Sequence, residues 1–378
     1  LEFRRVLFRS VYYFLNIQDP ETGAVLQNIG GGRDTPHDNL DCRYTDNIKQ
    51  SGDERRIWPG WARPPAKFTT LYAMYANALG ESDPDLARRC EAAARASVRR
   101  DRELDLHDAD SLQWRAWGYL ELYRHSGDDA DRDAGVQALG ELVALQVTDH
   151  IGGQSETRGF FRAAADGEAY HHKHVGASFP VWVLAEYVEA FPAHADVSRW
   201  REAMALWVDD YALVFAARNP FGLLPHALYA APPADNPNHH YRPLGDALYF
   251  RYFVTGKFGT NARSSLDAAA LAAAARVLDR PELASHAYRL LEWTLGNNPF
   301  QLSTMNGVGV VQPCALSFQM GNIPGGVTMG IFGDEADQPW YPHAWACTDE
   351  YYGYQTSQFM WAVLALQRDA VGQAGSRQ

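Results

Sequence analysis

The stretch DSLQWRAWGYLELYRH, residues 110–125, shows the periodicity that dominates this chain. Its apolar side chains recur at three- and four-residue spacing, which places them on one face of an α-helix. Ranges with the same pattern follow one another along the sequence: 66–79, 84–100, 131–148, 174–190, 196–217, 260–278, 282–296 and 354–370, with residues 11–18 as the end of a further helix. No stretch sustains the two-residue alternation of a strand, so the sequence predicts a mainly α fold.

The loops between these predicted helices alternate in length. The long loops cover 19–65, 149–173, 218–259 and 297–353, and they are separated by short loops at 80–83, 126–130, 191–195 and 279–281 and a medium one at 101–109. If consecutive helices run up and down, alternate loops lie on opposite ends of the molecule, so we expect all the long loops on one face. Loops longer than about 15 residues are usually functional. The pattern predicts an (α/α)6 barrel, a toroid of six helical hairpins, with a cleft on its long-loop face.

The composition narrows the classes of partner. The 378 residues include 34 Lys plus Arg against 46 Asp plus Glu, and the formal charge of −12 argues against nucleic acids and anionic membrane surfaces. No apolar run approaches the roughly 18 residues of a membrane span. The 11 Trp and 19 Tyr residues supply flat side chains that stack on sugar rings or fill cores. Neutral or cationic ligands are therefore favoured, and nothing in the sequence indicates an oligomeric state.

The first ten residues differ in character from the rest. EFRRVLFRS, residues 2–10, resembles the translation of a sequencing-adapter oligonucleotide, so residues 1–10 are treated as an artefact and left out of the fold prediction. We expect a single domain over residues 11–371 and a tail over 372–378. A six-hairpin ring needs twelve helices, which leads us to expect a truncation of about two helices and most of a third upstream of Val11.

The C-terminal third carries the most specific motifs. LGNNPF (295–300) ends a predicted helix, and GVG (307–309), GNIPGG (321–326) and TDEY (348–351) follow before the last helix. This order resembles glycoside hydrolase family 9, the inverting β-glucanases of the six-hairpin α/α-barrel class. QDPETG (18–23) and the ranges 66–79 and 116–128 are similar to further segments of that family. The resemblance spans nearly all of residues 11–370.

The resemblance implies that Glu350 is the general acid of a glycoside hydrolase. Hydrolysis with inversion needs a protonated carboxylic acid at the leaving oxygen and a second carboxylate, roughly 6.5–9.5 Å away, that activates water. Glu350 ends the longest loop, on the face where the long loops are expected. Acidic residues also favour helix starts, so a purely structural role for Asp349 and Glu350 stays open.

Two parts of the family's pattern are absent from this sequence. The catalytic base belongs to an Asp-Ala-Gly-Asp motif that would lie upstream of Val11, and Asp38-Asn-Leu-Asp41 does not replace it because it follows the QDP landmark and lacks the glycine. The His-His-Arg cluster that grips cellulose after the Gly-x-Gly turn is replaced by VVQPCAL, residues 310–316. We therefore expect this chain to be inactive or nearly so by itself, and the substrate is open between cellulose, a related β-glucan and another β-linked glycan.

Aromatic and histidine side chains gather in the long loops, where we expect contacts with a poly- or oligosaccharide. The predicted substrate-binding residues are Trp58, Trp61, His171, His172, His239, His240, His343, Trp345, Asp349 and Tyr351. Stacking on sugar and packing of the loops are both open for these tryptophans and for Trp340. No cofactor or metal is predicted, because the histidines lack Cys or acidic partners at set spacing. The loop Asp334-Glu-Ala-Asp337 suits a structural calcium ion, but a solvated acidic loop is the favoured interpretation.

Two other functions stay open. A polysaccharide lyase or an unsaturated uronyl hydrolase on the same fold would use His, Tyr and Arg, and Tyr170, Tyr241 and Arg242 stand beside the histidine-rich loops. A glycan-binding relic would keep the aromatic cleft without catalysis, since one fold hosts many functions. The resemblance also implies secretion or a periplasmic location, because such enzymes meet their polymers outside the cytoplasm.

Overall fold

The computed structural model describes most of the chain, as two compact units. The described residues are 10–25, 29–30, 56–57, 65–151, 156–165, 169–171, 178–234, 236–255, 259–312, 323–342, 348–351 and 353–375. Unit 1 covers Leu1–Glu141 and unit 2 covers Leu142–Gln378, and each is described by itself. Within the described ranges, every helix is too short or too polar to span a bilayer.

Unit 1 consists of successive helices joined by short turns, with one small strand pair. Its elements are a helix over residues 10–16, β1 (Ile29–Gly30), β2 (Arg56–Ile57), α3 (Pro65–Leu79), α4 (Pro84–Leu104), α5 (Ala109–Ser126) and α6 (Asp129–Ala144), which continues into unit 2. Asp83 and Asp108 cap two of these helices, because their carboxylates accept the N–H groups of Leu86 and Ser111, each at 3.0 Å. Pro84 lies in the first turn of α4, as expected for a residue without an N–H.

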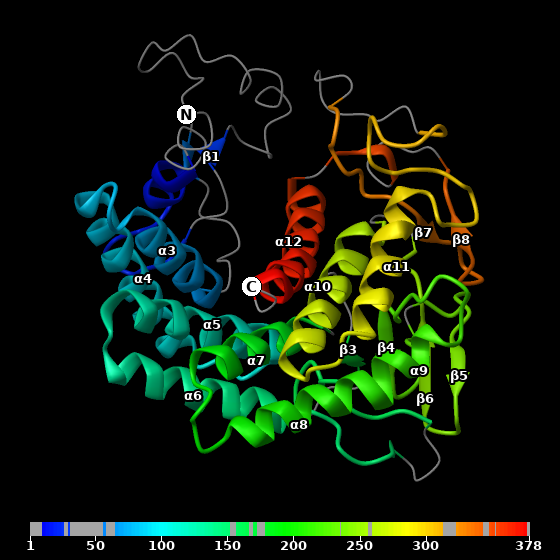
Figure 1. Ribbon diagram of the computed structural model, residues 1–378, viewed down its shortest axis with the longest axis horizontal. Coiled ribbons are helices and arrows are strands. Elements are labelled where there is room, and N and C mark those ends of the chain that lie inside the picture. The colour runs from blue at the N-terminus through cyan, green and yellow to red at the C-terminus, as the bar shows by residue number, and fades with distance from the viewer. Residues whose placement is uncertain are drawn as a thin grey trace. The chain divides into compact units, whose positions relative to one another are not determined.

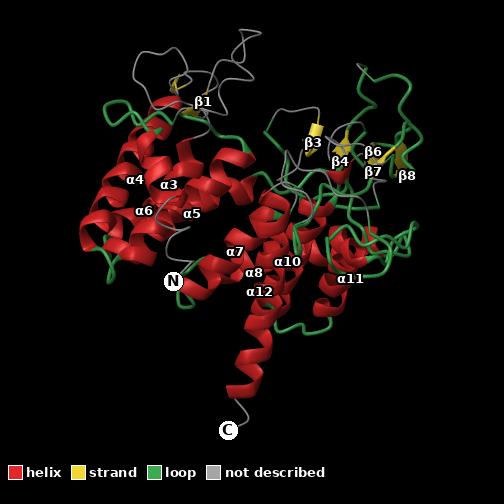
Figure 2. Ribbon diagram, turned by 90° about the horizontal axis from the view of Figure 1, so that it is seen from above, coloured by secondary structure: helices red, strands yellow, loops and turns green. Residues whose placement is uncertain are grey.

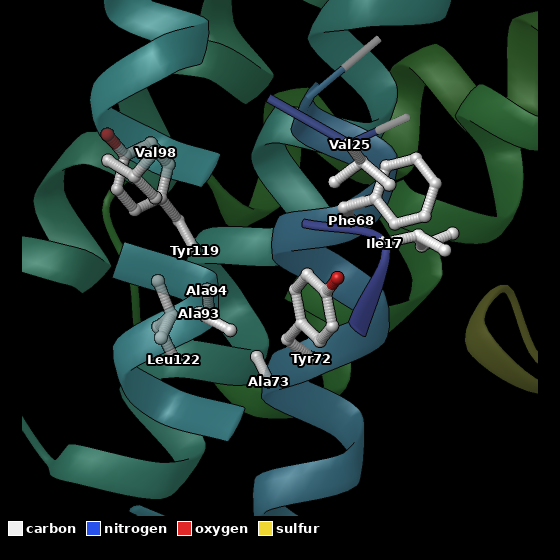
Figure 3. Close-up of a cluster of buried hydrophobic side chains, with 10 residues drawn as sticks. All are labelled: Ile17, Val25, Phe68, Tyr72, Ala73, Ala93, Ala94, Val98, Tyr119 and Leu122. Atoms are coloured by element: carbon white, nitrogen blue, oxygen red, sulfur yellow. The ribbon is translucent and has the colours of Figure 1, made fainter. Parts of the chain in front are cut away.

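The core of unit 1 joins the segment 10–25 to α3, α4 and α5 (Figure 3). The ten buried residues drawn there are Ile17, Val25, Phe68, Tyr72, Ala73, Ala93, Ala94, Val98, Tyr119 and Leu122. The Tyr72 hydroxyl donates a hydrogen bond to the Phe14 carbonyl at 2.7 Å. The helix end predicted over residues 11–18 is therefore confirmed as a packed part of this unit.

Unit 2 is arranged around α10. Its helical elements are α7 (Phe179–Ala190), α8 (Val197–Trp207), the π-turn η2 (Val208–Ala212), α9 (Leu213–Ala216), α10 (Asn261–Val277), α11 (Leu283–Leu295) and α12 (Gly353–Gly375). Every residue of α10 except Arg276 is buried, and its many alanines allow neighbouring helices to approach closely. Figure 1 shows α10 between α12 and α11, and α7 packs against it as well.

Short strands occupy the long loops of unit 2. β3 (Ala169–His171), β4 (Ala227–Tyr229), β5 (Arg242–Leu244) and β6 (Leu248–Arg251) form an antiparallel sheet in the order β3-β4-β6-β5, and β7 (Phe332–Gly333) pairs with β8 (Pro339–Trp340). A further bridge joins Thr255 to Gly333. Figure 2 shows these strands gathered on one side of the unit 2 helices. The three long loops of unit 2 thus lie together, as their alternation in length predicts.

The predicted helices are confirmed, with differences at several boundaries. α4 runs to Leu104 and α12 to Gly375, beyond their predicted ends at 100 and 370. The range predicted as 131–148 ends at Ala144, because Val147 pairs instead with residues 159–160, its N–H donating to Phe160 and its carbonyl accepting from Gly159. α7 begins at Phe179, and residues 174–177 of the predicted range lie outside the described residues. The sheets are a correction, since the sequence analysis expected no strands in the long loops.

Candidate active site

Glu350 lies between a π-helical turn that contains Thr348 and Asp349 and the start of α12. The backbone N–H of Met329 donates to the Glu350 carbonyl at 2.9 Å, and the N–H of Gly330 donates to the Thr348 carbonyl at 3.0 Å. One residue further along, Tyr351 forms an antiparallel bridge with Thr328. The segment 348–351 is thus held along the segment 328–330, and the position of the Glu350 main chain is fixed on both sides.

The side chain of Glu350 is half-buried, and this environment favours its protonated form. Burial raises the pKa of the Glu350 carboxyl above its usual value. A carboxyl that keeps its proton nearer to neutral pH is suited to donate it to a leaving group.

Asp349 turns away from the surface. Its side chain is 2% exposed, and its carboxylate accepts a hydrogen bond from the hydroxyl of Tyr341. Burial and this carboxylate raise the pKa of the Tyr341 hydroxyl, so the hydroxyl stays a donor. The structure therefore gives no support to the predicted sugar contact of Asp349, whose carboxylate serves the interior of the protein.

Tyr351 is part of the same construction. Its hydroxyl accepts the N–H of Ile323 at 3.1 Å, and its ring lies against Gly326 so closely that a Cβ there would come within 2.8 Å of it. Gly325 has a φ of +79°, and the N–H of Gly326 donates to the Ile323 carbonyl. The two glycines are turn residues, as predicted, and a side chain at Gly326 would displace the Tyr351 ring.

The framework behind this segment comes from α10 and from the LGNNPF motif. Asn261, fully buried at the start of α10, donates to the Thr304 hydroxyl at 2.8 Å and to the Thr328 carbonyl at 2.9 Å. The amide of Asn298 bonds the carbonyls of Trp293 and Leu302, each at 2.8 Å, and so closes the turn after α11. The sequence analysis did not identify Asn261 or Tyr341. The partners of Asn261 are more than 40 residues away, and a tyrosine that binds an aspartate eight residues later forms no recognisable motif.

The sequence matches no family model and no curated protein. Solved structures match its fold. A single mutant of a thermostable endoglucanase from Alicyclobacillus acidocaldarius has a TM-score of 0.60 and 18% identity, over 94% of this chain and 63% of that one. A family 9 protein of Bacteroides ovatus has a TM-score of 0.57 and 14% identity, over 96% and 61% of the two chains. The cellulase Cel9M of C. cellulolyticum in complex with cellobiose has a TM-score of 0.53 and 12% identity, over 94% and 75%.

The chain has the fold of the family 9 glycoside hydrolases. The predicted mainly α class, an (α/α)6 barrel of helical hairpins, is confirmed by this likeness. The chain spans 63% and 61% of the lengths of the first two structures, which is less than two thirds.

The histidines predicted to bind sugar are only partly described in this family 9 fold. His239 is half-buried near the ring of Tyr241, whereas the neighbouring His240 is exposed and its backbone N–H donates to the Glu335 carbonyl at 2.7 Å. His171 belongs to β3, opposite Leu228. His172, His343, Trp58, Trp61 and Trp345 lie outside the described residues. Their roles, and those of His171, His239 and His240, stay predictions.

Trp340 is the one of the four loop tryptophans named in the sequence analysis that lies within the described residues. It lies in β8, it is 48% exposed, and its ring meets that of Phe332 edge-on at 5.2 Å between centroids. A large exposed area is compatible with stacking on a sugar ring, and stacking and packing of the loops both stay open for Trp340.

The interpretation of residues 334–337 as a solvated acidic loop is wrong for Asp337. This carboxylate is fully buried; it accepts from Arg242 Nε at 2.6 Å and from the N–H groups of Tyr252 and Phe253, each at 3.1 Å. Arg251 lies 3.7 Å from it. In the described part of the chain no group of three or more His, Cys, Asp or Glu residues is arranged to hold a metal ion. Asp337 is thus an anchor that ties one long loop to the next.

Proposed function

We propose that this chain is the larger part of the catalytic barrel of an inverting glycoside hydrolase that cleaves a β-linked glycan, with Glu350 as the general acid. The observation that carries the proposal is the Glu350 carboxyl itself, half-buried, with a raised pKa, on a backbone pinned before α12. The family 9 fold supports it, because two of the similar structures are an endoglucanase and a cellulase, the latter in complex with cellobiose.

The reaction divides between two carboxyl groups. Glu350 donates its proton to the glycosidic oxygen as the bond between C1 and that oxygen breaks, and a second carboxylate draws a proton from the water that attacks C1 from the opposite side. We infer that this second group is the upstream aspartate that the family resemblance implies. The chain by itself then hydrolyses glycans at a rate near background, because it protonates the leaving group but does not activate water.

The substrate is a poly- or oligosaccharide, and cellulose is one of several β-linked candidates. Where the family carries His-His-Arg after the Gly-x-Gly turn, this chain exposes apolar surface: Val310 is 100% exposed and Val311 is 52% exposed. Residues 313–316 of the replaced segment lie outside the described residues. A site without that cationic grip holds sugar hydroxyls more weakly there, which favours a glycan other than crystalline cellulose.

Azide provides a test that needs no activated water. In this reaction the C1–O bond breaks, a C1–N bond forms with inversion, and Glu350 passes its proton to the leaving oxygen. A β-glucan oligosaccharide incubated with the chain and sodium azide should yield an α-glycosyl azide, detected by mass spectrometry and by NMR of the anomeric proton. Glu350→Gln should abolish this product, because an amide has no acidic proton to give.

A matched control separates the acid from a general charge effect. Glu335 is exposed in the same long loop, so Glu335→Gln should form the azide product at the wild-type rate. Equal rates in wild type and Glu350→Gln would remove Glu350 from the mechanism, and no azide product from the wild type would contradict the hydrolase proposal.

The lyase or uronyl hydrolase alternative loses part of its basis. Arg242, one of its predicted residues, is bound to the carboxylate and the carbonyl of Asp337, and the ring of Tyr241 lies under Arg251 with 5.6 Å between the guanidinium carbon and the ring centroid. Both side chains thus have structural partners. A product absorbing in the near ultraviolet, formed from a uronate polymer, would nevertheless favour the lyase over the hydrolase.

A further inference from the structure

The hydroxyl of Tyr341 joins the two segments that hold Glu350. It donates to the carboxylate of Asp349, eight residues further along the chain. It also has side-chain hydrogen bonds with Thr348 and Thr328. Thr348 and Asp349 directly precede Glu350, whereas Thr328 lies on the segment that pairs with it. A single phenolic oxygen therefore connects the turn that precedes the acid with the segment that pairs with it.

The aim of Glu350 depends on where Asp349 points. Thr348 and Asp349 form the end of a π-helical turn, and Glu350 is the first residue after it. Asp349 is 2% exposed and faces the interior, whereas the side chain of Glu350, the next residue, is only half-buried. A rotation of this segment that released Asp349 from the interior would turn Glu350 away from its present direction. The buried position of Asp349 therefore determines the orientation of the Glu350 side chain.

Tyr341 is itself held firmly enough to act as the anchor. Its side chain is 8% exposed, and its ring lies 6.2 Å, between centroids, from that of Phe300. Phe300 belongs to the LGNNPF turn, where its N–H donates to the Asn298 side chain at 3.1 Å. The chain of contacts therefore runs from the closed turn after α11, through two aromatic rings, to Asp349 and Glu350.

We propose that Tyr341 is a positioning residue for Glu350: its hydrogen bond to the buried Asp349 fixes the turn that directly precedes Glu350, so that the acid faces the glycosidic oxygen. The effect on catalysis rests on the proposed function. The effect of Tyr341 on the orientation and environment of the Glu350 carboxyl does not, because it can be measured in the chain without substrate. Tyr341 touches neither substrate nor reacting atoms in this role.

The first readout is the rate of azide product formation. Tyr341→Phe should lower kcat about 10- to 100-fold while KM changes less than about twofold, because a misplacement of roughly 1 Å costs up to about 100-fold in rate without removing binding contacts. Asp349→Asn keeps an oxygen that accepts the Tyr341 hydroxyl, whereas Asp349→Val does not. Asp349→Asn should therefore recover most of the kcat that Asp349→Val loses.

The second readout needs no activity. In the chain labelled with 13C at the glutamate carboxyl, the Glu350 signal is assigned by its absence in Glu350→Gln, and its pKa is followed by NMR. Tyr341→Phe should lower this pKa toward the ordinary glutamate value, because the released segment exposes the carboxyl to water. Tyr72→Phe removes another buried hydroxyl, in unit 1, and should leave the Glu350 pKa and kcat unchanged.

The outcomes separate the two proposals. If Tyr341→Phe retains wild-type kcat and the wild-type Glu350 pKa, the positioning role is overturned, and the hydrolase proposal stands on its own azide product. If the wild type forms no azide product but its Glu350 pKa is raised and falls in Tyr341→Phe, the hydrolase proposal fails and the positioning role is supported. An equal loss of kcat in Tyr341→Phe and Tyr72→Phe would show that Tyr341 acts only through the overall stability of the protein, and it would overturn the inference.

Discussion

Replacing Asp337 by alanine should destabilise unit 2 by about 3–5 kcal/mol, the loss expected when one partner of a buried ion pair is removed. The Asp337 carboxylate is 0% exposed and binds Arg242 together with the N–H groups of Tyr252 and Phe253. Arg251 is 3% exposed and has two nitrogens, Nε and Nη1, without a hydrogen-bond partner, so the nearby carboxylate is its charge compensation. Arg242 is partly exposed and regains water, but Arg251 would keep a buried charge.

The assay is chemical denaturation followed by tryptophan fluorescence and circular dichroism. Asp337→Asn keeps an acceptor oxygen for the two backbone N–H groups but loses the charge, so its loss of unfolding free energy should lie between wild type and Asp337→Ala. Glu335→Ala, two residues away and exposed, should change it by less than about 0.5 kcal/mol. A loss below about 1 kcal/mol in Asp337→Ala would refute the reasoning that this carboxylate anchors the long loops.

Three further predictions concern the surroundings of Glu350. Asn261→Ala should lower the unfolding free energy by about 1–3 kcal/mol, because it leaves the buried Thr328 carbonyl without its donor and removes a second hydrogen bond to the Thr304 hydroxyl; a loss under about 0.5 kcal/mol in denaturation would contradict this. Gly326→Ala should lower both Tm and the rate of azide product formation, because the new Cβ would lie 2.8 Å from the Tyr351 ring and 2.9 Å from the Ile323 carbonyl oxygen; unchanged values would show that the turn adapts. Burial raises the folded-state pKa of Glu350 above its unfolded value near about 4.3, so its contribution to stability is present below that value and is lost as the pH rises through the folded-state pKa. Denaturation at a series of pH values should show wild type losing more stability than Glu350→Gln over that window, and parallel curves would contradict the raised pKa.

The helices were predictable because their signals are local. The apolar spacing in α5 lies within the helix that it shapes, and it was sufficient to predict the range 110–125. The structure adds the capping residue Asp108 at its start. The alternation of loop lengths predicted an arrangement in space, namely that the long loops lie on one face. It could do so because alternate loops between up-and-down helices lie at opposite ends of the molecule. The bridge between Thr255 and Gly333 confirms that consequence within unit 2.

The sheets and the anchors were not predictable from such signals. β3 and β4 have three residues each, too few for a two-residue period to stand out, and their paired residues, 169 with 229 and 171 with 228, are 60 and 57 positions apart. Asp337 is bound by Arg242, 95 residues away, so the sequence around it reads as an ordinary acidic loop. Tyr341 and Asp349 are close in sequence, but no sequence motif indicates that both are buried and joined by a hydrogen bond.

The most direct test of the central claim, that Glu350 is the general acid, is the dependence of rate on the leaving group. A series of aryl β-glycosides with leaving groups from dinitrophenol to unsubstituted phenol is assayed in the presence of azide, with wild type and Glu350→Gln side by side. The account predicts that Glu350→Gln approaches the wild-type rate with dinitrophenolate, which leaves without a proton, and falls progressively further behind as the leaving group becomes more basic. A constant ratio of the two rates across the series would contradict the assignment of Glu350 as the acid.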